Sequence, residues 1–378
     1  MKQNNRLKER MGRWLLTPVL ILVLALAVVW VGGMLRNKML GGICLAGSPV
    51  LWGLALLVLY GAGLFQIIIH ELGHLIFGLL SGYEFVSFRI GKWMLAAGQG
   101  GYKLRKYTVV GTAGQCLMLP PPRDEYGRYP TILYNLGGSA FNLLVAALCV
   151  LLSPLLPASL FLRIFFWGSA LIGLLLGLSN AIPLKMGGIA NDGHNAWSLK
   201  KDRAGSRAFW LQLQVNGLLT RGRALADLPR EWFEMPGDDQ LTNPLVCGLA
   251  AFCAAYHHDR HDLARAEAIS RRLLEHAPGM LEVHRNELRC ELLFYEIFGP
   301  CRQQQIDALY TKELKKYIKL TASYISRSRL QYAYALLVQH DESKAEKALA
   351  RFEQVAKSYP FRGEVESERR LVELVRQK

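Results

Sequence analysis

The sequence predicts a multi-span α-helical membrane protein with about four transmembrane helices, a small membrane-associated β-hairpin or sheet, and an all-α soluble C-terminal domain. Three observations support this fold class. Of the 378 residues, 51% are hydrophobic, and the mean hydropathy is +0.16. Nearly all the long uncharged runs fall in residues 1–199, whereas residues 200–378 are charged and helix-favouring. We therefore predict a membrane-embedded domain over residues 1–199 and a helical cytoplasmic domain over residues 200–378.

The charge of the chain follows the same division. Residues 1–199 carry 16 Lys and Arg against 6 Asp and Glu, and residues 200–378 carry 29 against 24. The basic residues of the first part stand mostly at the ends of apolar runs, where membrane topology and anionic headgroups explain them. We therefore expect the lipid bilayer, and not nucleic acid, to be the partner of this part, despite a pI near 9.6.

The first two spans are expected over residues 14–35 and 49–81. The first is uncharged, long enough to cross a hydrocarbon core of ~30 Å, and follows a basic segment that predicts a cytoplasmic N-terminus. A signal peptide is the alternative, but the run is long for one and has no convincing cleavage site. The second begins near Pro49, a good first-turn residue. It is long for one span, so we expect a tilt, a bend near Gly61 and Gly63, or two shorter segments.

Residues 83–118 are expected to form strands. Residues 83–91 and 102–110 each alternate between polar and apolar side chains, and a glycine-rich turn stands between them. This pattern predicts a β-hairpin or a small sheet. Seven basic residues in and just after this region place it on the cytoplasmic side: Arg89, Lys92, Lys103, Arg105, Lys106, Arg123 and Arg128.

Two further spans are expected over residues 130–153 and 160–182. The short link between them is uncharged and suits the outer face. Four spans put both termini in the cytoplasm, so we predict a multi-pass protein of the plasma membrane. They also put residues 183–199 on the cytoplasmic side, near the end of the second span.

The C-terminal domain is expected to consist of helical hairpins. Residues 263–276 and 345–359 read as helices, each followed by a proline, with Ala266 and Ala348 twelve residues before those prolines. This spacing resembles the second helix of a tetratricopeptide unit, although the segment between the two copies fits the pattern poorly. We expect residues 200–378 to bind a cytoplasmic protein partner or the substrate's cytoplasmic part. The alternative is a solvated helical domain that only stabilises the protein.

The most informative motif is His70-Glu71-Leu72-Gly73-His74 in the second span. On a helix, residues i and i+4 project from one face, so both imidazoles are able to bind one metal ion, with Glu71 beside them as a general base. Composition alone produces such a motif roughly once in a hundred chains of this kind. The alternative is two core histidines with a stray glutamate, but an unpaired glutamate in an apolar span costs a few kcal/mol.

A catalytic zinc needs a third protein ligand and one open position. Asp192 is the leading candidate, because it follows the fourth span in a segment where Asn180 and Pro183 interrupt the helix and glycines allow the backbone to turn. The alternative is an ordinary turn aspartate. His194 is a competing ligand. Glu84 is a weaker candidate, because it lies ten residues after His74 in the polar segment that follows the second span.

These residues resemble the site-2 protease family of intramembrane zinc metalloproteases over about residues 60–200. The motif from His70 to His74 matches the family's zinc helix. The segment from Phe88 to Gly114 is similar to its membrane-associated β-hairpin, Gly138-Ser-Ala-Phe-Asn142 to its glycine-to-asparagine element, and Asn180-x-x-Pro183 with Asp192-Gly193 to the element that supplies the third ligand.

The chain departs from the family pattern at several places. The usual proline beside the glycine that precedes Asn142 is absent, because the chain has Gly137-Gly138 there. The gap from Pro183 to Asp192 is longer than expected, His194 replaces a second glycine, and no PDZ-like insertion precedes Gly138.

The resemblance implies an intramembrane zinc endopeptidase that acts on transmembrane proteins or signal peptides in regulated intramembrane proteolysis. His70, His74 and Asp192 would hold one Zn²⁺, Glu71 would act as the general base, and Asn142 would orient the substrate or stabilise the oxyanion. An interhelical hydrogen bond is the structural alternative for Asn142. An exposed hairpin could pair with an unwound substrate strand. The small size and few spans are typical of bacterial members.

The sequence is also compatible with two alternative functions. One is a different kind of membrane zinc protease that uses the same motif but takes a downstream glutamate as its ligand, and no suitable glutamate stands in the later spans. The other is a membrane scaffold or adaptor that acts through its helical tail and has an inactive or structural zinc site. Glu71 discriminates between these, because a purely structural site needs no general base.

Overall fold

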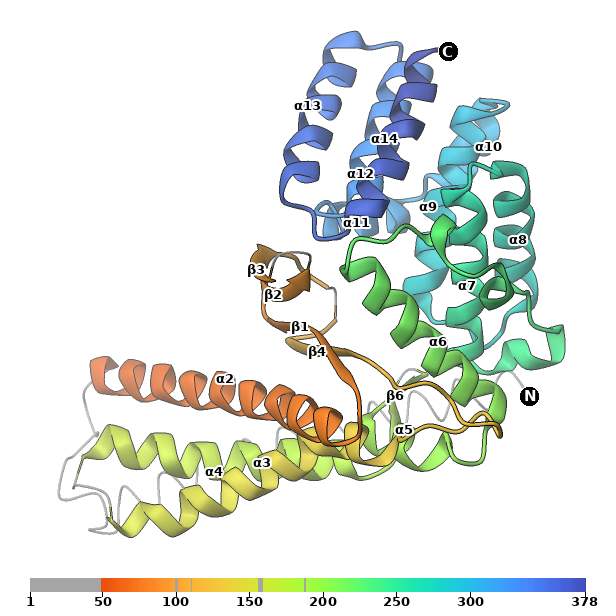
Figure 1. Cartoon of the computed structure of the whole chain (residues 1–378). Helices are drawn as coiled ribbons and strands as arrows, with labels where there is room; N and C mark the ends of the chain where they lie inside the picture. Colours follow the sequence, from red (N-terminus) through yellow and green to blue (C-terminus); the bar gives the residue numbers. More distant parts are fainter. Residues whose placement is uncertain (1–48, 99–100, 110, 156–158, 187) are drawn as a thin grey trace, which may run out of the picture. The chain divides into compact units, whose positions relative to one another are not determined.

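The computed structural model describes residues 49–98, 101–109, 111–155, 159–186 and 188–378 (Figure 1). The expected span at residues 14–35 lies outside the described residues. The chain divides into two compact units. Within the described residues, the first unit contains residues 49–81 and 130–198, and the second contains residues 82–129 and 199–378. This division groups the β region with the C-terminal helices, whereas it was expected to belong to the membrane-embedded domain over residues 1–199.

Three helices of the first unit are long and apolar enough to cross a membrane: α2 (Pro49–Leu80), α3 (Ile132–Leu152) and α4 (Leu160–Ala181). They confirm the helices expected over residues 49–81, 130–153 and 160–182. They lie side by side, and the 3-10 turn η1 (Ser153–Leu155) follows α3 (Figure 1). α2 is one continuous helix of 32 residues, so the division into two shorter segments is not present.

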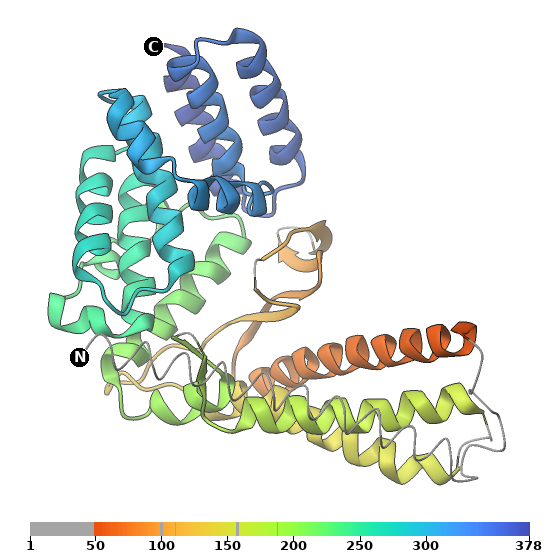
Figure 2. The ribbon, with the colours of Figure 1, turned by 180° about the vertical axis from the view of Figure 1, so that it is seen from behind.

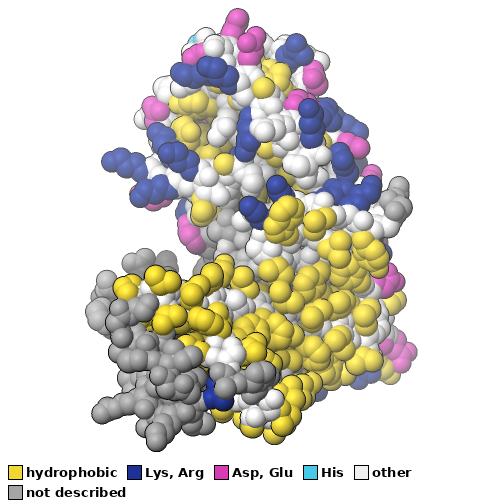
Figure 3. All heavy atoms as spheres, turned by 90° about the vertical axis from the view of Figure 1, so that its left-hand side faces the viewer, with side chains coloured by type: hydrophobic (Ala, Val, Ile, Leu, Met, Phe, Trp, Pro, Cys, Tyr) yellow, Lys and Arg dark blue, Asp and Glu magenta, His cyan; other side chains and the backbone are white. Residues whose placement is uncertain are grey.

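The outer surface of these helices is hydrophobic. Leu56 and Leu57 are each 64% exposed, and Figure 3 shows hydrophobic side chains gathered over the three helices. Large contiguous apolar surfaces are rare on soluble monomers and mark membrane or protein contacts. Their burial requires an apolar environment, which agrees with the membrane-protein character that the composition predicts.

Glycines bring the backbones of α2 and α3 into close contact. A Cβ atom on Gly73 would lie 2.2 Å from the carbonyl oxygen of Gly137, and a Cβ on Gly137 would lie 2.6 Å from that of Gly73. Small residues allow this approach between apolar helices. This close contact lies at Gly73, next to His74, so α3 packs directly against the motif.

The second unit contains a four-stranded antiparallel sheet in the order β3-β2-β1-β4. Its strands are β1 (Glu84–Ile90), β2 (Trp93–Gly98), β3 (Gly101–Lys106) and β4 (Gly114–Leu119). The expected small sheet is confirmed, but the two segments that suggested a hairpin form β1 and β3, which do not pair with each other. β2 lies between them, and its sequence Trp-Met-Leu-Ala-Ala-Gly has no polar residues, so it lacks the alternation that reveals a strand.

The sheet is attached to the C-terminal helices at two places. Beside β4, side chains of α6 (Arg203–Thr220) donate hydrogen bonds to the proline-rich segment that follows the strand. Trp210 Nε1 donates to the carbonyl oxygen of Pro121 at 2.9 Å, and Gln214 Nε2 donates to that of Pro120 at 2.9 Å. Beside β3, Arg105 Nη1 donates to the carbonyl oxygens of Tyr359 at 3.0 Å and Pro360 at 2.8 Å.

The remaining helices form an all-α array (Figure 2). The predictions of helices over residues 263–276 and 345–359 are confirmed by α8 (Leu263–His276) and α13 (Glu342–Ser358). The tetratricopeptide character stays a prediction. The elements are the 3-10 turns η2 (Leu225–Asp227), η3 (Arg230–Phe233) and η4 (Asp238–Thr242), the helices α7 (Pro244–Asp259), α8 (Leu263–His276), α9 (Glu282–Phe298), α10 (Gln303–Leu309), α11 (Lys312–Leu320), α12 (Ile325–Ala333), α13 (Glu342–Ser358) and α14 (Arg362–Arg376), and the π turn η5 (Tyr334–Val338).

A buried arginine ties three of these helices together. Arg329 on α12 is fully buried, and its Nη2 lies 2.6 Å from Glu291 Oε2 on α9. Its Nε pairs with the carboxylate of Glu368 on α14, and its guanidinium stands over the ring of Phe294. Buried charges are tolerated when they are paired in this way, so the pairs fix how these helices align.

Candidate metal centre

Two imidazoles of α2 point at one position beside α3. His70 and His74 lie one helical turn apart, and their Nε2 atoms are 3.1 Å from each other. The rings are nearly perpendicular, with centroids 4.8 Å apart. The sequence spacing therefore produces the shared face that was expected of it.

Asp192 completes the cluster, although it stands far from the two histidines in the sequence, near the C-terminal end of the first unit. Its Oδ2 lies 3.1 Å from His70 Nε2 and 3.4 Å from His74 Nε2. Among the described residues, these three form a group that could hold a metal ion. The structure therefore brings together the three ligands predicted from the sequence.

A short turn holds Asp192 in this place. After α4 the chain forms the strands β5 (Lys185–Met186) and β6 (Ile189–Ala190), and Asp192 begins helix α5 (Asp192–Ser198). The Asn191 side chain fastens this turn to the end of α4, because its Nδ2 donates to the carbonyl oxygens of Ser179 and Ile182, each at 2.7 Å. Gly193 allows the approach, since a Cβ there would lie 2.2 Å from the carbonyl oxygen of Ala181.

Each histidine is oriented through its second ring nitrogen. His70 Nδ1 lies 2.7 Å from Asn142 Oδ1, and His74 Nδ1 lies 2.8 Å from the carbonyl oxygen of Tyr134. Both oxygens only accept hydrogen bonds, so each Nδ1 carries a proton and, in the neutral ring, each Nε2 presents a lone pair. Metal-binding histidines are usually held by such a contact.

The spacing of the three donor atoms fits a tetrahedral zinc ion. Zinc–nitrogen and zinc–oxygen bonds of ~2.0–2.1 Å imply distances of roughly 3.3–3.4 Å between neighbouring ligand atoms. The separations of 3.1 Å between the two Nε2 atoms and of 3.1 and 3.4 Å to Asp192 Oδ2 are close to this value. Two nitrogen lone pairs and a carboxylate oxygen so close together require a cation or a shared proton between them.

A buried amide network supports the cluster from behind. Asn142 and Gln66 are both 0% exposed. Asn142 Nδ2 donates to the Gln66 carbonyl and to Gln66 Oε1, each at 2.8 Å, and Gln66 Nε2 donates to the carbonyl oxygen of Ser169 at 3.0 Å. The network links α2, α3 and α4, so both polar groups of Asn142 are used in interhelical hydrogen bonds.

Gly138 leaves the space that the cluster needs. A Cβ atom at this position would lie 2.6 Å from His70 Cε1 and 2.7 Å from the Nε2 atoms of His70 and His74. Any other residue would therefore press on the donor atoms. This glycine was part of the expected glycine-to-asparagine element, but its contact with the imidazoles was not expected.

The other sequence candidates have different surroundings. Glu71 is 8% exposed within α2, next to the first histidine. His194 is outside the metal-ligating group of the described residues, and its Nδ1 is buried without a hydrogen-bond partner among them. Burial and the charge of Lys185 lower the pKa of His194. Glu84 belongs to the second unit, where it pairs with Arg221 Nη2 at 2.9 Å.

Sequence reasoning missed two groups of the site. Gln66 could have been noticed, because it is the polar residue four positions before His70 and so lies on the same helical face. The Tyr134 carbonyl oxygen carries no signal in the sequence, because any residue supplies that group.

In comparisons with known protein families, with curated protein sequences and with solved structures, nothing matched the chain. Within the described residues, the fold and the site define a mostly helical protein. It has three helices long and apolar enough to cross a membrane, a small four-stranded sheet, and a His–His–Asp cluster that could hold one metal ion.

Proposed function

We propose that the chain is an intramembrane zinc endopeptidase that cleaves peptide bonds in or near transmembrane segments of membrane proteins or signal peptides. The observation that carries the proposal is the convergence of His70 Nε2, His74 Nε2 and Asp192 Oδ2 at 3.1–3.4 Å from one another. The buried Glu71 stands beside them on a helix apolar enough to cross a membrane. This combination agrees with the resemblance to the site-2 protease family.

Three residues would hold the metal, and a fourth would move the proton. His70, His74 and Asp192 would bind one Zn²⁺ and leave one position open. Zinc, when bound, supplies a Lewis acid that lowers the pKa of water and polarises a peptide carbonyl. Glu71 would accept the proton of the attacking water and deliver it to the leaving amine. The surrounding apolar helices would restrict bulk water and strengthen these electrostatic interactions.

The proposal includes a membrane topology. Residues 14–35 would provide a fourth span in addition to α2, α3 and α4, with both termini in the cytoplasm and the protein in the plasma membrane. The C-terminal helices would then be available to a cytoplasmic partner or to the cytoplasmic part of a substrate. Trypsin digestion of inside-out and right-side-out vesicles tests this arrangement, and protection of the C-terminal helices in inside-out vesicles would contradict it.

Glu71→Ala is the experiment that tests the proposed chemistry. Wild-type protein and the variant are placed in proteoliposomes with tagged single-span reporter proteins whose transmembrane segments carry helix-breaking residues. We expect the wild-type protein to bind about one zinc ion per chain and to cleave reporters, and the variant to bind zinc without cleaving. Cleavage by a zinc-loaded Glu71→Ala variant would contradict the protease assignment. Zinc binding without cleavage of any reporter by the wild-type protein would favour the scaffold with a structural zinc site.

The third ligand is tested by zinc content. Asp192→Ala removes one of the three donor atoms, so we expect it to lose zinc, whereas His194→Ala keeps all three and is expected to retain it. Both variants are compared by metal analysis after the same dialysis. Unchanged zinc content in Asp192→Ala together with loss in His194→Ala would transfer the ligand role to His194.

A further inference from the structure

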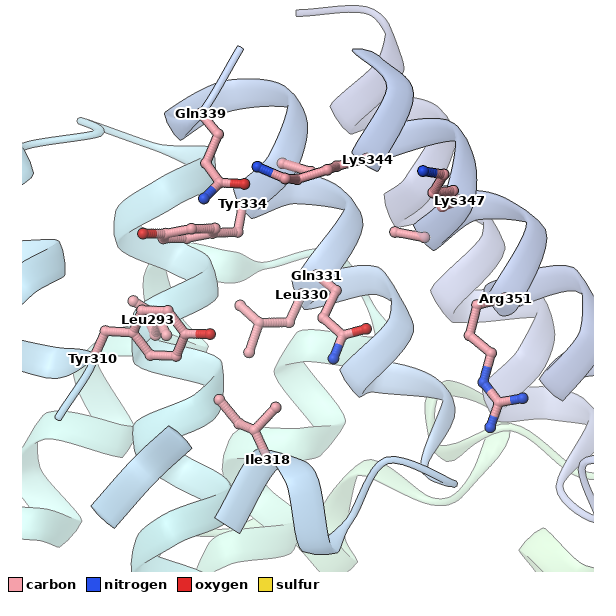
Figure 4. Close-up of a pocket in the computed structure, with 12 residues that line it drawn as sticks. Leu293, Tyr310, Ile318, Leu330, Gln331, Tyr334, Gln339, Lys344, Lys347 and Arg351 are labelled. Carbon is pink, nitrogen blue, oxygen red and sulfur yellow. The ribbon is translucent and has the colours of Figure 1, made fainter. Parts of the chain in front are cut away.

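The C-terminal helices enclose a pocket that is separate from the metal centre. The pocket has a volume of about 460 Å³ and lies among α9, α11, α12, α13 and the π turn η5 (Figure 4). Its size falls in the range of ligand-binding cavities. All the elements that form it belong to the second unit.

The inner part of the pocket is apolar and aromatic. Leu293, Ile318 and Leu330 are buried residues of its lining. Tyr310 and Tyr334 stand on the opposite side from α13, with ring centroids 5.1 Å apart (Figure 4). An apolar and aromatic wall of this kind suits a bulky hydrophobic side chain.

One wall of the pocket is basic. Lys344, Lys347 and Arg351 line it from α13 at positions i, i+3 and i+7, which share one helical face. Lys344 pairs with Asp341 at 2.9 Å, and Arg351 Nη1 donates to Gln354. Among the described residues, Lys347 has no hydrogen-bond or ion-pair partner, and no aspartate or glutamate lines the pocket. The wall therefore offers positive charge that is not neutralised inside the pocket.

The edge of the pocket offers two side-chain amides, one on α12 and one directly after the π turn η5. Gln331 and Gln339 line it, and the backbone N–H of Gln339 donates to the Tyr334 carbonyl oxygen at 3.1 Å, the i+5 bond of a π turn. Such turns occur often at functional sites, because they displace side chains from regular helical packing. Glutamine side chains both donate and accept, as a peptide backbone requires.

We propose that this pocket binds an acidic peptide segment that carries a bulky hydrophobic side chain. The hydrophobic side chain enters between Leu330 and the two tyrosines, and carboxylates beside it pair with Lys347 and Arg351. Charge complementarity selects the segment and the apolar floor supplies its anchor. The peptide site is independent of the proposed zinc chemistry.

The test is fluorescence anisotropy with full-length protein in detergent micelles. The probe is a short fluorescein-labelled peptide with a central Leu-Phe pair flanked by glutamates. We expect saturable binding, and binding at least about tenfold weaker, a loss of ~1.4 kcal/mol, when the glutamates are replaced by glutamines. Replacement of the Leu-Phe pair by Ser-Gly is expected to weaken binding to a similar degree.

Two variants of the protein separate the charged wall from the apolar floor. Lys347→Glu combined with Arg351→Glu is expected to abolish binding, whereas the matched charge reversal Lys357→Glu combined with Arg370→Glu, at exposed positions outside the lining, is expected to preserve it. Ala348→Trp changes no charge and fills the pocket, so it is also expected to abolish binding. Circular dichroism confirms that each variant is folded.

Three outcomes would overturn the proposal. The first is that the wild-type protein shows no saturable binding. The second is that the two charge-reversed proteins bind the peptide equally well, and the third is that the glutamate and glutamine peptides bind equally well. An Asp192→Ala protein without zinc is expected to bind the peptide as the wild type does. The proposal of a peptide site and the proposal of a zinc site can therefore be contradicted independently.

Discussion

Asn142 Oδ1 accepts a hydrogen bond from His70 Nδ1 over 2.7 Å, and this contact decides which ring nitrogen of His70 faces Asp192. Because Nδ1 holds the proton, the Nε2 lone pair is free for a metal. Asn142 is itself fixed by its donation to Gln66. In these contacts, Asn142 is a positioning residue of the candidate metal centre.

Replacement of Asn142 by alanine is expected to lower zinc affinity about 10–100-fold, the usual cost of losing such a partner. Asn142→Asp keeps an acceptor for His70 Nδ1 but loses the donation to Gln66, so it is expected to restore only part of the affinity. Competition with a chromogenic chelator measures both. If Asn142→Ala binds zinc as the wild type does but has lost cleavage, then Asn142 acts on the substrate or the oxyanion, as the family resemblance implies.

Replacement of Gly138 by alanine is expected to weaken zinc binding while leaving the helices folded. The new Cβ would lie 2.6–2.7 Å from ring atoms of His70 and His74, so the donor atoms must move apart. Overpacking of this kind costs ~1–3 kcal/mol, which corresponds to roughly a 5- to 150-fold loss of affinity. Metal analysis after dialysis measures the loss. Gly61→Ala is the control, because a Cβ there meets nothing within 4 Å; equal zinc content in the two variants would contradict the prediction.

The third prediction concerns β3 as a site of substrate pairing. β3 pairs with β2 on one side and with no described strand on the other, and its Leu104 is exposed. An edge strand of this kind is able to pair with an unwound substrate. Lys103→Pro and Leu104→Pro each remove one backbone donor, and successive amides of a strand point to opposite edges. We expect the variant whose lost amide faces the free edge to lose reporter cleavage and keep its zinc.

Leu104→Ala keeps the backbone donor and serves as the control for β3. Reporter cleavage by gel assay and zinc content by metal analysis are measured on the same preparations. Full cleavage by both proline variants would exclude strand pairing at this edge.

Periodic patterns in the sequence predicted most of what the structure shows at the candidate metal centre. The spacing of His70 and His74 placed two ligands on one face, and the turn residues around Asp192 indicated a segment that could reach them. Gln66 was missed although it lies on the helical face of His70. The Tyr134 carbonyl oxygen carries no signal in the sequence, because its role depends on how α2 and α3 pack. Local patterns do not record such tertiary contacts, and an apolar strand such as β2 is missed for a similar reason.

The fourth prediction concerns the buried pairs of Arg329. Arg329→Met would leave Glu291 and Glu368 without the guanidinium that they share. Breaking a buried ion pair usually costs ~3–5 kcal/mol. We expect a large fall in the thermal stability of the C-terminal helices, measured by circular dichroism. Arg272→Met removes an exposed pair with Asp238, which is worth at most about 1 kcal/mol; equal effects of the two substitutions would contradict the assigned role of Arg329.

The fifth prediction is a dependence of stability on pH through Glu364. Burial, followed by the charge of Glu368, raises the pKa of Glu364 from 4.5 to about 8, although a hydrogen bond from the Tyr359 hydroxyl, at 3.0 Å, acts in the opposite direction. Because the folded state then holds a proton that the unfolded state releases, the free energy of unfolding falls as pH rises from about 4.5 toward 8.

Glu364→Gln removes this titration, so its thermal stability is expected to change less than that of the wild type between about pH 5 and pH 8. One pKa unit corresponds to ~1.4 kcal/mol, which moves the Tm of a domain of this size by roughly 3–6 °C. Melting of both proteins is followed by circular dichroism at several pH values. Glu366→Gln is the control, because it neutralises an exposed glutamate on the same helix. The prediction would be contradicted if the wild-type Tm stayed constant or rose across this range, or if the Tm of Glu364→Gln declined identically. Either result would show that Glu364 ionises normally and that its burial is compensated by other groups.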